Sequence, residues 1–244
     1  ASLDTLDGQP LHSANALAWD GEEALLFTDG SQQFGAAQWS HDLMSLGRSG
    51  RAARWWVPAG KAELLARELS HAFGVLPAPG GVLVSESWRH RVLMLDKSLG
   101  SAQGAGNATP LLAELPGYPS RLAPAADGGF WLSCFVCRTQ LVEFVLREPA
   151  YRQRMVAEIA PAHWIAPALS SGHSFLEPLQ GAGVKNMGVL KPWAPPRSYG
   201  LVLHVSANGR IQRSLHSQVD GHHHGITALA EHGTALLVAS KGSG

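Results

Sequence analysis

The chain has 244 residues, 45% of them hydrophobic, which is enough for one compact domain with a sizeable core. Its 19 basic and 19 acidic side chains give a formal net charge of zero, and no basic run occurs, so a nucleic-acid partner is not expected. No apolar stretch approaches the roughly 20 residues that span a bilayer. The first residues lack the pattern of a signal peptide, but a signal could have been removed, so cytoplasmic and periplasmic or secreted locations both stay open.

Four segments share one pattern: a short apolar strand, a turn that contains Asp or Gly, and a second strand that ends in small or polar residues. They read NALAWDGEEALLFTDGS from Asn15, FGVLPAPGGVLVSES from Phe73, RLAPAADGGFWLSCF from Arg121 and ITALAEHGTALLVASKG from Ile226. Each segment is typical of a β-hairpin with glycine in the turn. The starts lie 58, 48 and 105 residues apart, so the first two spacings match one four-stranded propeller blade each.

The segments between the repeats supply further strands. Residues 91–96 and 110–115 are predicted to complete the second blade. Residues 200–205 and 210–215 form another predicted hairpin around Asn208-Gly209, a dipeptide typical of a type I′ turn, and we assign it to the outer half of the third blade.

The predicted fold class is therefore all-β: an incomplete β-propeller of about three and a half blades that forms one partial domain over residues 1–244. An unclosed ring exposes sheet edges, so we expect pairing with missing blades or with another chain.

The long third spacing predicts a helix and loop insertion at residues 146–198, within a blade. The stretch from Glu148 has helical character, with Pro149 early in the helix and with Tyr151, Met155 and Ile159 repeating every four residues along one face. The proline-rich residues 191–197 are expected to form an ordered loop over one face of the ring.

The two cysteines, Cys134 and Cys137, are spaced as C-x-x-C. One such pair supplies at most two zinc ligands, and the surrounding residues have strand character rather than the helix start of a redox motif. Buried thiols are the favoured interpretation, with a disulfide and a redox or metal role as alternatives.

Several motifs resemble those of strictosidine-synthase-like proteins. VSESWRHRV at residues 84–92 resembles the family's V-A-E-T-x-x-x-R-I stretch, LPGYP at residues 115–119 resembles L-P-G-Y-P-D-N, and FTDGS at residues 27–31 resembles Y-F-T-D-S-S. The resemblance covers nearly the whole chain outside the insertion, which looks like that of a bacterial branch. It implies the six-bladed propeller fold of gluconolactonase, regucalcin and paraoxonase, of which this chain would lack about the first two blades and the very end.

In a propeller, the residues at the start of each innermost strand line a central channel. The repeat alignment predicts such a ring, and with it the ligand-binding residues, at Asn15, Phe73, Ser120 with Arg121, and His224. Asn15 has a strand-entry cap as its alternative role. The resemblance implies Asn, Asn and Asp at the matching positions of the calcium-dependent lactonases, and only Asn15 agrees. Calcium requires six to eight oxygen ligands. We therefore expect no metal and no cofactor, unless missing blades supply the calcium ligands.

The candidate catalytic residues are His224 and Glu86. The resemblance to strictosidine synthase places His224 near the general-base glutamate of that enzyme, and a histidine can serve as a base. Because the carboxylate itself is absent, the synthase reaction is not expected. Glu86 would be an acid or base at the channel, or else a structural ion-pair partner of Arg89 or Arg91.

Two aromatic side chains and a histidine run have open roles. Tyr118 and Trp193 would line a pocket or simply pack. The run His222 to His224 is a surface loop, a loop with one functional histidine, or a metal site.

Together these residues favour an enzyme that hydrolyses a small-molecule ester or lactone. One alternative is a non-catalytic propeller that binds a ligand or a partner. Another is a domain of a larger, transport-associated polypeptide.

Overall fold

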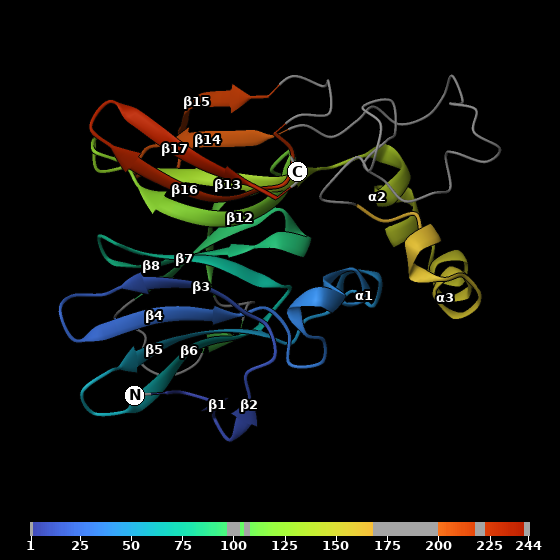
Figure 1. The fold of residues 1–244 in the computed structure, drawn as a ribbon, viewed down its shortest axis with the longest axis horizontal. Coiled ribbons are helices and arrows are strands. Elements are labelled where there is room, and N and C mark those ends of the chain that lie inside the picture. Colours follow the sequence, from blue (N-terminus) through green and yellow to red (C-terminus); the bar gives the residue numbers. More distant parts are fainter. Residues whose placement is uncertain (1, 97–102, 105–107, 168–199, 218–222, 242–244) are drawn as a thin grey trace.

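The computed structural model describes residues 2–96, 103–104, 108–167, 200–217 and 223–241. Within them, the strands form three sheets of four or five strands and two sheets of two strands, almost all antiparallel. The larger sheets stack face to face as the blades of an unclosed propeller, so the all-β class is confirmed (Figure 1). No helix among the described residues is long and apolar enough to cross a bilayer.

The first blade follows a short N-terminal hairpin of β1 (Thr5–Leu6) and β2 (Gln9–Pro10). Its antiparallel strands run outward from the innermost position as β3 (Ala14–Trp19), β4 (Ala24–Asp29), β5 (Gly50–Trp56) and β6 (Lys61–Leu69). A two-residue strand, β10 (Gln103–Gly104), pairs in parallel with the outer strand β6.

The second and third blades have the same four-stranded order, innermost strand first. The second contains β7 (Ala72–Ala78), β8 (Gly81–Glu86), β9 (Arg91–Asp96) and β11 (Thr109–Leu112). The third contains β12 (Gly117–Pro124), β13 (Phe130–Cys137), β14 (Leu201–Val205) and β15 (Ile211–His216). A last hairpin consists of β16 (Ile226–His232) and β17 (Ala235–Ser240). All four hairpins of the repeat are therefore present in the structure.

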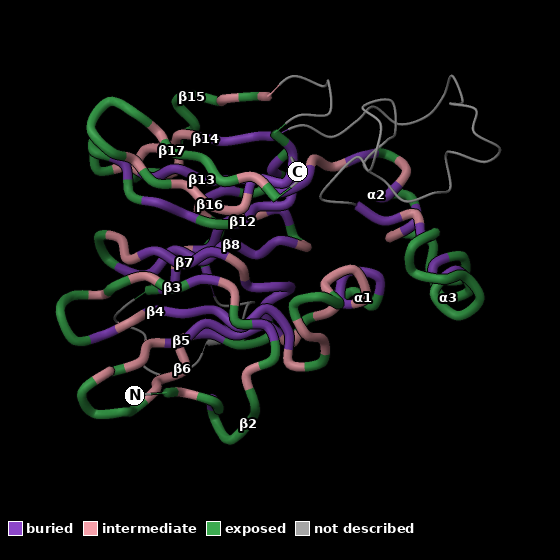
Figure 2. The backbone as a smooth tube through the Cα atoms, viewed as in Figure 1, coloured by how far each residue is buried: buried purple, intermediate pink, exposed green. Residues whose placement is uncertain are grey.

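The second strands of the second and third blades are almost completely buried, because each of these blades packs against a neighbouring sheet on both faces. Every residue of β8 is buried, and β13 is buried except at its last residue. One core cluster joins Leu26 to Val84 between the first two blades, and another joins Leu83 to Leu132 between the second and the third. Figure 2 shows this buried interior in the middle strands and exposed turns at the sheet ends.

The three α-helices of the described residues lie at one end of the strands, opposite the hairpin turns (Figure 1). They are α1 (Trp39–Met44), α2 (Gln140–Arg147) and α3 (Pro149–Glu158). The helix predicted from Pro149 is confirmed. Of the three apolar residues that repeat every four positions, Met155 is buried, while Tyr151 and Ile159 are 49% and 45% exposed. The sequence analysis missed α1 and α2; α2 begins after Thr139, whose hydroxyl accepts a hydrogen bond from the amide of Val142.

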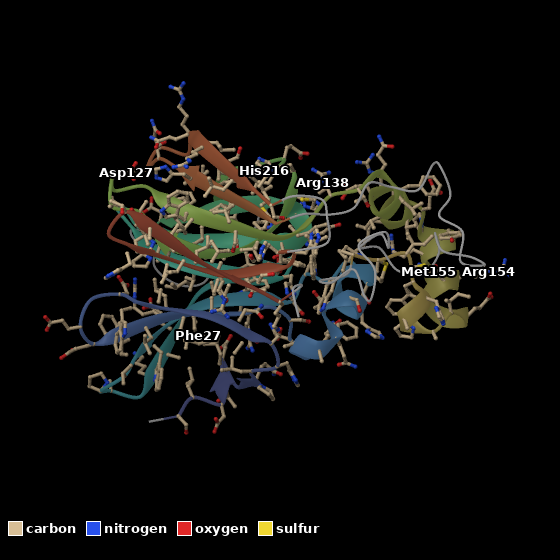
Figure 3. All side chains as sticks on the ribbon, turned by 45° about the horizontal axis from the view of Figure 1, so that its top comes forward. Phe27, Asp127, Arg138, Arg154, Met155 and His216 are labelled. Carbon is tan, nitrogen blue, oxygen red and sulfur yellow. The ribbon has the colours of Figure 1, made fainter. Side chains whose placement is uncertain are left out.

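Figure 3 shows the same two ends through their side chains: Asp127 lies in the β12–β13 turn, and Arg138 follows β13 at the helical end. The turn before β15 differs from the predicted type I′, because Gly209 has a positive φ of 81° and Asn208 does not. Cys134 and Cys137 both lie on β13, no disulfide joins these two described residues, and Cys134 is buried. The proline-rich residues 191–197, Trp193 and His222 lie outside the described residues.

Candidate functional site

A cavity of about 100 Å³ lies at the helical end, where the innermost strands β3, β7 and β16 begin. These strands and β12 pack next to one another, which brings residues far apart in the sequence together. The described residues that line the cavity are Asn15, Ala36, Trp39, His71, Phe73, Phe135, Thr227 and Lys241. Two of the predicted ring residues, Asn15 and Phe73, are among them.

Hydroxyl side chains on the second strands hold adjacent innermost strands together. Thr28 on β4 donates to the carbonyl of Phe73 on β7 at 2.6 Å, and Ser85 on β8 donates to the carbonyl of Ser120 on β12 at 2.6 Å. The buried Ser120 hydroxyl contacts Ser133 and donates to the carbonyl of Ile226 at 3.1 Å. Ser120 thus contributes to the packing of the strands. The hydroxyl residues that recur on the second strands, Thr28, Ser85 and Ser133, are a sequence signal that could have been found.

Asn15 connects three of the innermost strands. Its side-chain amide nitrogen donates to the backbone carbonyl of Ala72 on β7 at 2.9 Å. The backbone carbonyl of Asn15 accepts from the guanidinium of Arg121 on β12 at 2.6 Å. An amide nitrogen has two N–H donors, and Ala72 occupies one of them. Asn15 therefore links neighbouring innermost strands and also places its side chain on the cavity wall.

Gly30 permits this close packing. A Cβ atom on Gly30 would lie 2.5 Å from the amide nitrogen of Asn15 and 3.0 Å from the Cε1 atom of His71. Both distances are shorter than an ordinary van der Waals contact between carbon and its neighbours. A side chain at this position would therefore displace the two polar groups of the cavity wall.

The cavity wall contains a histidine backed by a buried carboxylate. The Nδ1 atom of His71 lies 3.4 Å from the Oδ2 atom of Asp42 on α1, and the two side chains are 4% and 1% exposed. The same carboxylate oxygen accepts a hydrogen bond from the indole nitrogen of Trp88 at 2.6 Å. Trp88 also stacks on the imidazole ring, with centroids 4.2 Å apart, so Asp42 and Trp88 together set the position of His71.

Aromatic rings form the apolar part of the wall. Phe73 stacks on Phe135 with centroids 5.7 Å apart, and Trp39 meets Phe135 edge-on at the same separation. These rings belong to a core cluster that also contains Tyr118 and Trp164. Tyr118 is completely buried, and burial, followed by the negative charge of Glu143, raises the pKa of its hydroxyl, which stays protonated. Tyr118 thus supports the wall from behind.

The two predicted catalytic residues are both fully buried. Glu86 accepts the amide of Ser70 at 2.7 Å and pairs with Arg91, which is the ion pair weighed as its structural alternative. His224 precedes β16, and its backbone carbonyl accepts from the hydroxyl of Ser240. On the described fourth innermost strand, the residue that reaches the cavity is Thr227.

The environment of Glu86 is repeated in the first blade. Asp29 accepts the amide of Ser13 at 2.7 Å and pairs with Arg51 at 2.6 Å. Each carboxylate ends the second strand of its blade, and each arginine is its register partner on the third strand. The repetition indicates a structural role: each carboxylate, held by its arginine, binds a backbone amide just before an innermost strand and so fixes the start of that strand.

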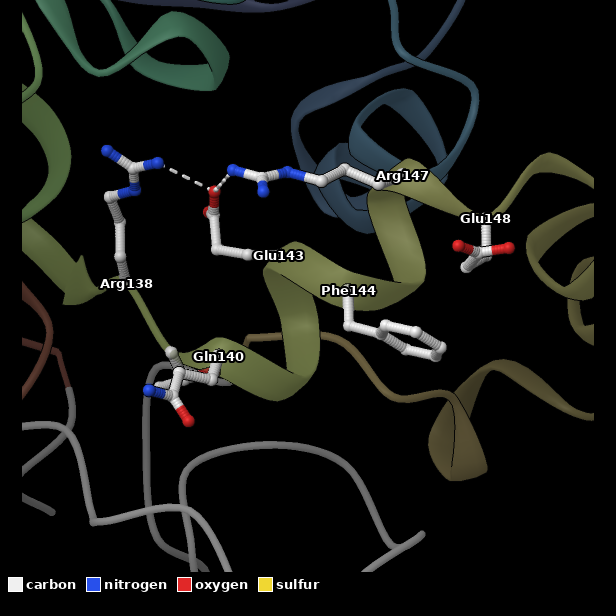
Figure 4. A pocket seen from close by; sticks show the side chains of 7 residues that line it. Arg138, Gln140, Glu143, Phe144, Arg147 and Glu148 are labelled. Carbon is white, nitrogen blue, oxygen red and sulfur yellow. Dashed lines mark hydrogen bonds and ion pairs between the residues drawn. The ribbon is translucent and has the colours of Figure 1, made fainter.

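A larger cavity of about 430 Å³ lies beside α2, at the foot of the insertion (Figure 4). In it, Glu143 pairs with Arg138 at 2.7 Å, contacts Arg147 at 3.9 Å and lies 3.3 Å from the Nε2 atom of His90. Burial raises the pKa of Glu143, but hydrogen bonds from His90 and Arg138 outweigh it and hold the pKa at about 2. The acidic and basic groups here neutralise one another and join α2 to the second blade.

The sequence analysis missed His71, Asp42, Trp39 and Trp88. His71 stands two residues before the predicted ring residue Phe73, so its position was a signal that could have been used. Asp42 and Trp39 lie on α1, a helix of only six residues whose existence the sequence pattern did not indicate. Within the described residues, no three His, Cys, Asp or Glu side chains converge in a way that could hold a metal ion.

Comparison with known proteins gives sequence relatives but no matching family model. The protein STRICTOSIDINE SYNTHASE-LIKE 10 of Arabidopsis thaliana is 29% identical over 71% of this chain and 50% of its own length. An adipocyte plasma membrane-associated protein of Salmo salar is 22% identical over 86% of this chain and 43% of its own length. Among solved structures, a luciferin-regenerating enzyme aligns over 93% of this chain and 53% of its own, with a TM-score of 0.48 and 13% identity.

The chain spans about half the length of the curated relatives that it matches. These relatives come from a plant and a fish, so the bacterial branch and the count of six blades remain predictions. The chain is homologous to strictosidine synthase-like 10, and its described residues form an unclosed, propeller-type all-β fold.

Proposed function

We propose that the cavity is the substrate site of a small-molecule hydrolase that cleaves an ester or a lactone. The observation that carries the proposal is the contact between His71 and Asp42 on the cavity wall. A carboxylate beside Nδ1 favours the tautomer with the proton on that nitrogen, which leaves Nε2 as a base. The distance of 3.4 Å exceeds that of a strong hydrogen bond, and such contacts often shorten when the substrate binds.

In this mechanism, Nε2 of His71 takes a proton from a water molecule as the water oxygen attacks the carbonyl carbon. Asp42 stabilises the imidazolium that forms. The remaining N–H of Asn15 and the hydroxyl of Thr227 are donors for the carbonyl oxygen as it gains negative charge. The C–O bond to the leaving group then breaks, and the imidazolium returns its proton to the leaving alkoxide. The products are the acid and the alcohol, which stay joined as a hydroxy acid when the substrate is a lactone.

The test is a hydrolysis screen over lactones and aryl esters, with and without calcium, followed by variants. His71→Gln should lower kcat/KM by at least about 10²-fold, the usual contribution of a general base. Asp42→Asn should lower kcat more than it raises KM, because it acts through His71. His163→Ala, which changes an exposed histidine of the insertion, is the matched control and should leave the rate unchanged.

The variants also separate the alternatives. Full activity in His71→Gln together with a loss in His224→Ala would return the role of base to His224, as the resemblance to strictosidine synthase implied. Ligand binding without turnover of any ester or lactone would favour the non-catalytic propeller.

A further inference from the structure

We infer that the cavity selects a small ligand with one flat apolar ring and an anionic carboxylate. This inference names the class of the acid that the hydrolase proposed above would release, and it rests on that proposal only for the statement that hydrolysis produces this ligand. It is carried by the shape of the wall and by the charges around the cavity.

The size and the lining of the cavity favour a single ring. Trp39, Phe73 and Phe135 form three aromatic sides. The volume is about 100 Å³, compared with the roughly 150 Å³ of an engineered apolar cavity that takes up benzene. Because the cavity is smaller than that one, a single aromatic or similarly flat ring is the largest group that its apolar part can take, and any larger group extends into the opening.

The charge on the lining residues is positive. Lys241 is the only permanently charged side chain among the described residues that line the cavity, and none of those residues is Asp or Glu. The Lys241 amide donates to the carbonyl of Gly225 at 3.0 Å, which fixes the backbone of this residue beside the start of β16. A second cation, the guanidinium of Arg121, lies against the carbonyl of Asn15.

The nearby carboxylates do not cancel this positive charge. Asp42 is 1% exposed behind His71, where it is occupied by Trp88. Asp29 and Glu86 are completely buried in ion pairs with Arg51 and Arg91. A ligand carboxylate would thus contact Lys241 without an opposing acidic group on the wall. The ring of the same ligand would then lie against Phe73 and Trp39. The acid released from an aryl-substituted ester or lactone has this chemistry.

The test measures the affinities of phenylacetate and of phenylacetamide, its neutral counterpart, by titration calorimetry. The wild-type chain should bind phenylacetate about tenfold more tightly, which is the contribution of one charge-assisted contact. Lys241→Gln should bring the ratio of the two affinities close to one, and Lys241→Arg should restore it. Lys61→Gln, which removes an exposed lysine at the start of β6, should leave the ratio unchanged.

Equal affinity for the two probes, a preference that survives in Lys241→Gln, or no binding of either probe at millimolar concentration would overturn the inference. The result is independent of turnover. A carboxylate preference without hydrolysis of any ester would reject the proposed function and keep the inference. Hydrolysis that depends on His71 without any carboxylate preference would reject the inference alone.

Discussion

Replacing Gly30 with alanine tests whether the geometry of the cavity wall carries the function. The added methyl group would lie 2.5 Å from the amide nitrogen of Asn15 and 3.0 Å from His71. Gly30 lacks a positive φ, so its backbone tolerates alanine, and the effect would come from these contacts alone. The Asn15 amide would have to move, and it would lose its 2.9 Å hydrogen bond to Ala72.

The expected magnitude follows from these two losses. Overpacking in a well-packed interior costs about 1–3 kcal/mol, and the lost hydrogen bond accounts for about 1 kcal/mol of that range. We therefore expect the free energy of unfolding to fall by about 1–3 kcal/mol. Because the catalytic groups would shift by several tenths of an ångström or more, kcat/KM should fall by up to about 10²-fold.

The assay combines denaturant unfolding with the rate on the best ester or lactone found in the screen. Gly35→Ala is the matched control, because Gly35 lies near the same end of the sheet in an extended conformation, where a Cβ would have only one neighbour, at 3.8 Å. Gly30→Ala with unchanged stability and an unchanged rate would refute the close approach of Asn15 and His71. A loss of stability with a full rate per folded molecule would refute the role of these groups in catalysis.

Two further predictions concern pH and calcium. The pKa of Glu143, at about 2, lies below the ordinary value of 4.5, so its ion pairs contribute fully above about pH 5 and are lost as the pH falls toward 2. Glu143→Gln should therefore lower stability by about 1 kcal/mol near pH 7, after allowance for solvent screening, and by much less near pH 2. An equal loss at both pH values would contradict this. Calorimetric titration should detect no low-micromolar calcium affinity, because Phe73 offers no oxygen ligand and Arg121 adds positive charge; a tight calcium site that includes Asn15 would show that the prediction is wrong.

The four-fold hairpin repeat could be identified from the sequence because a hairpin is a local structure. Each of the four hairpins is encoded by apolar strands and turn glycines that lie within about 20 residues of one another, and all four are present. The same reasoning placed Asn15 and Phe73 at the starts of innermost strands, where both line the cavity. It also identified the ion pair of Glu86 as an alternative to a catalytic role.

The local pattern was weaker where the helices are short. The apolar repeat from Tyr151 to Ile159 predicted a helix correctly, but of these three apolar residues only Met155 is buried, because the contacts of α3 with the rest of the protein decide which side is covered. Helix α2 contains β-branched and aromatic residues, whose weak helix propensity hid it.

The sequence by itself therefore determined the four hairpins, further strands of the second and third blades, and the all-β class. Only the tertiary structure decided which residues meet at the cavity. His71 and Asp42 are 29 positions apart, and Lys241 and Asn15 are separated by nearly the whole chain, yet they surround one cavity. Such contacts depend on how the sheets stack and on where α1 folds back over their ends, and no local periodicity in the chain encodes that arrangement.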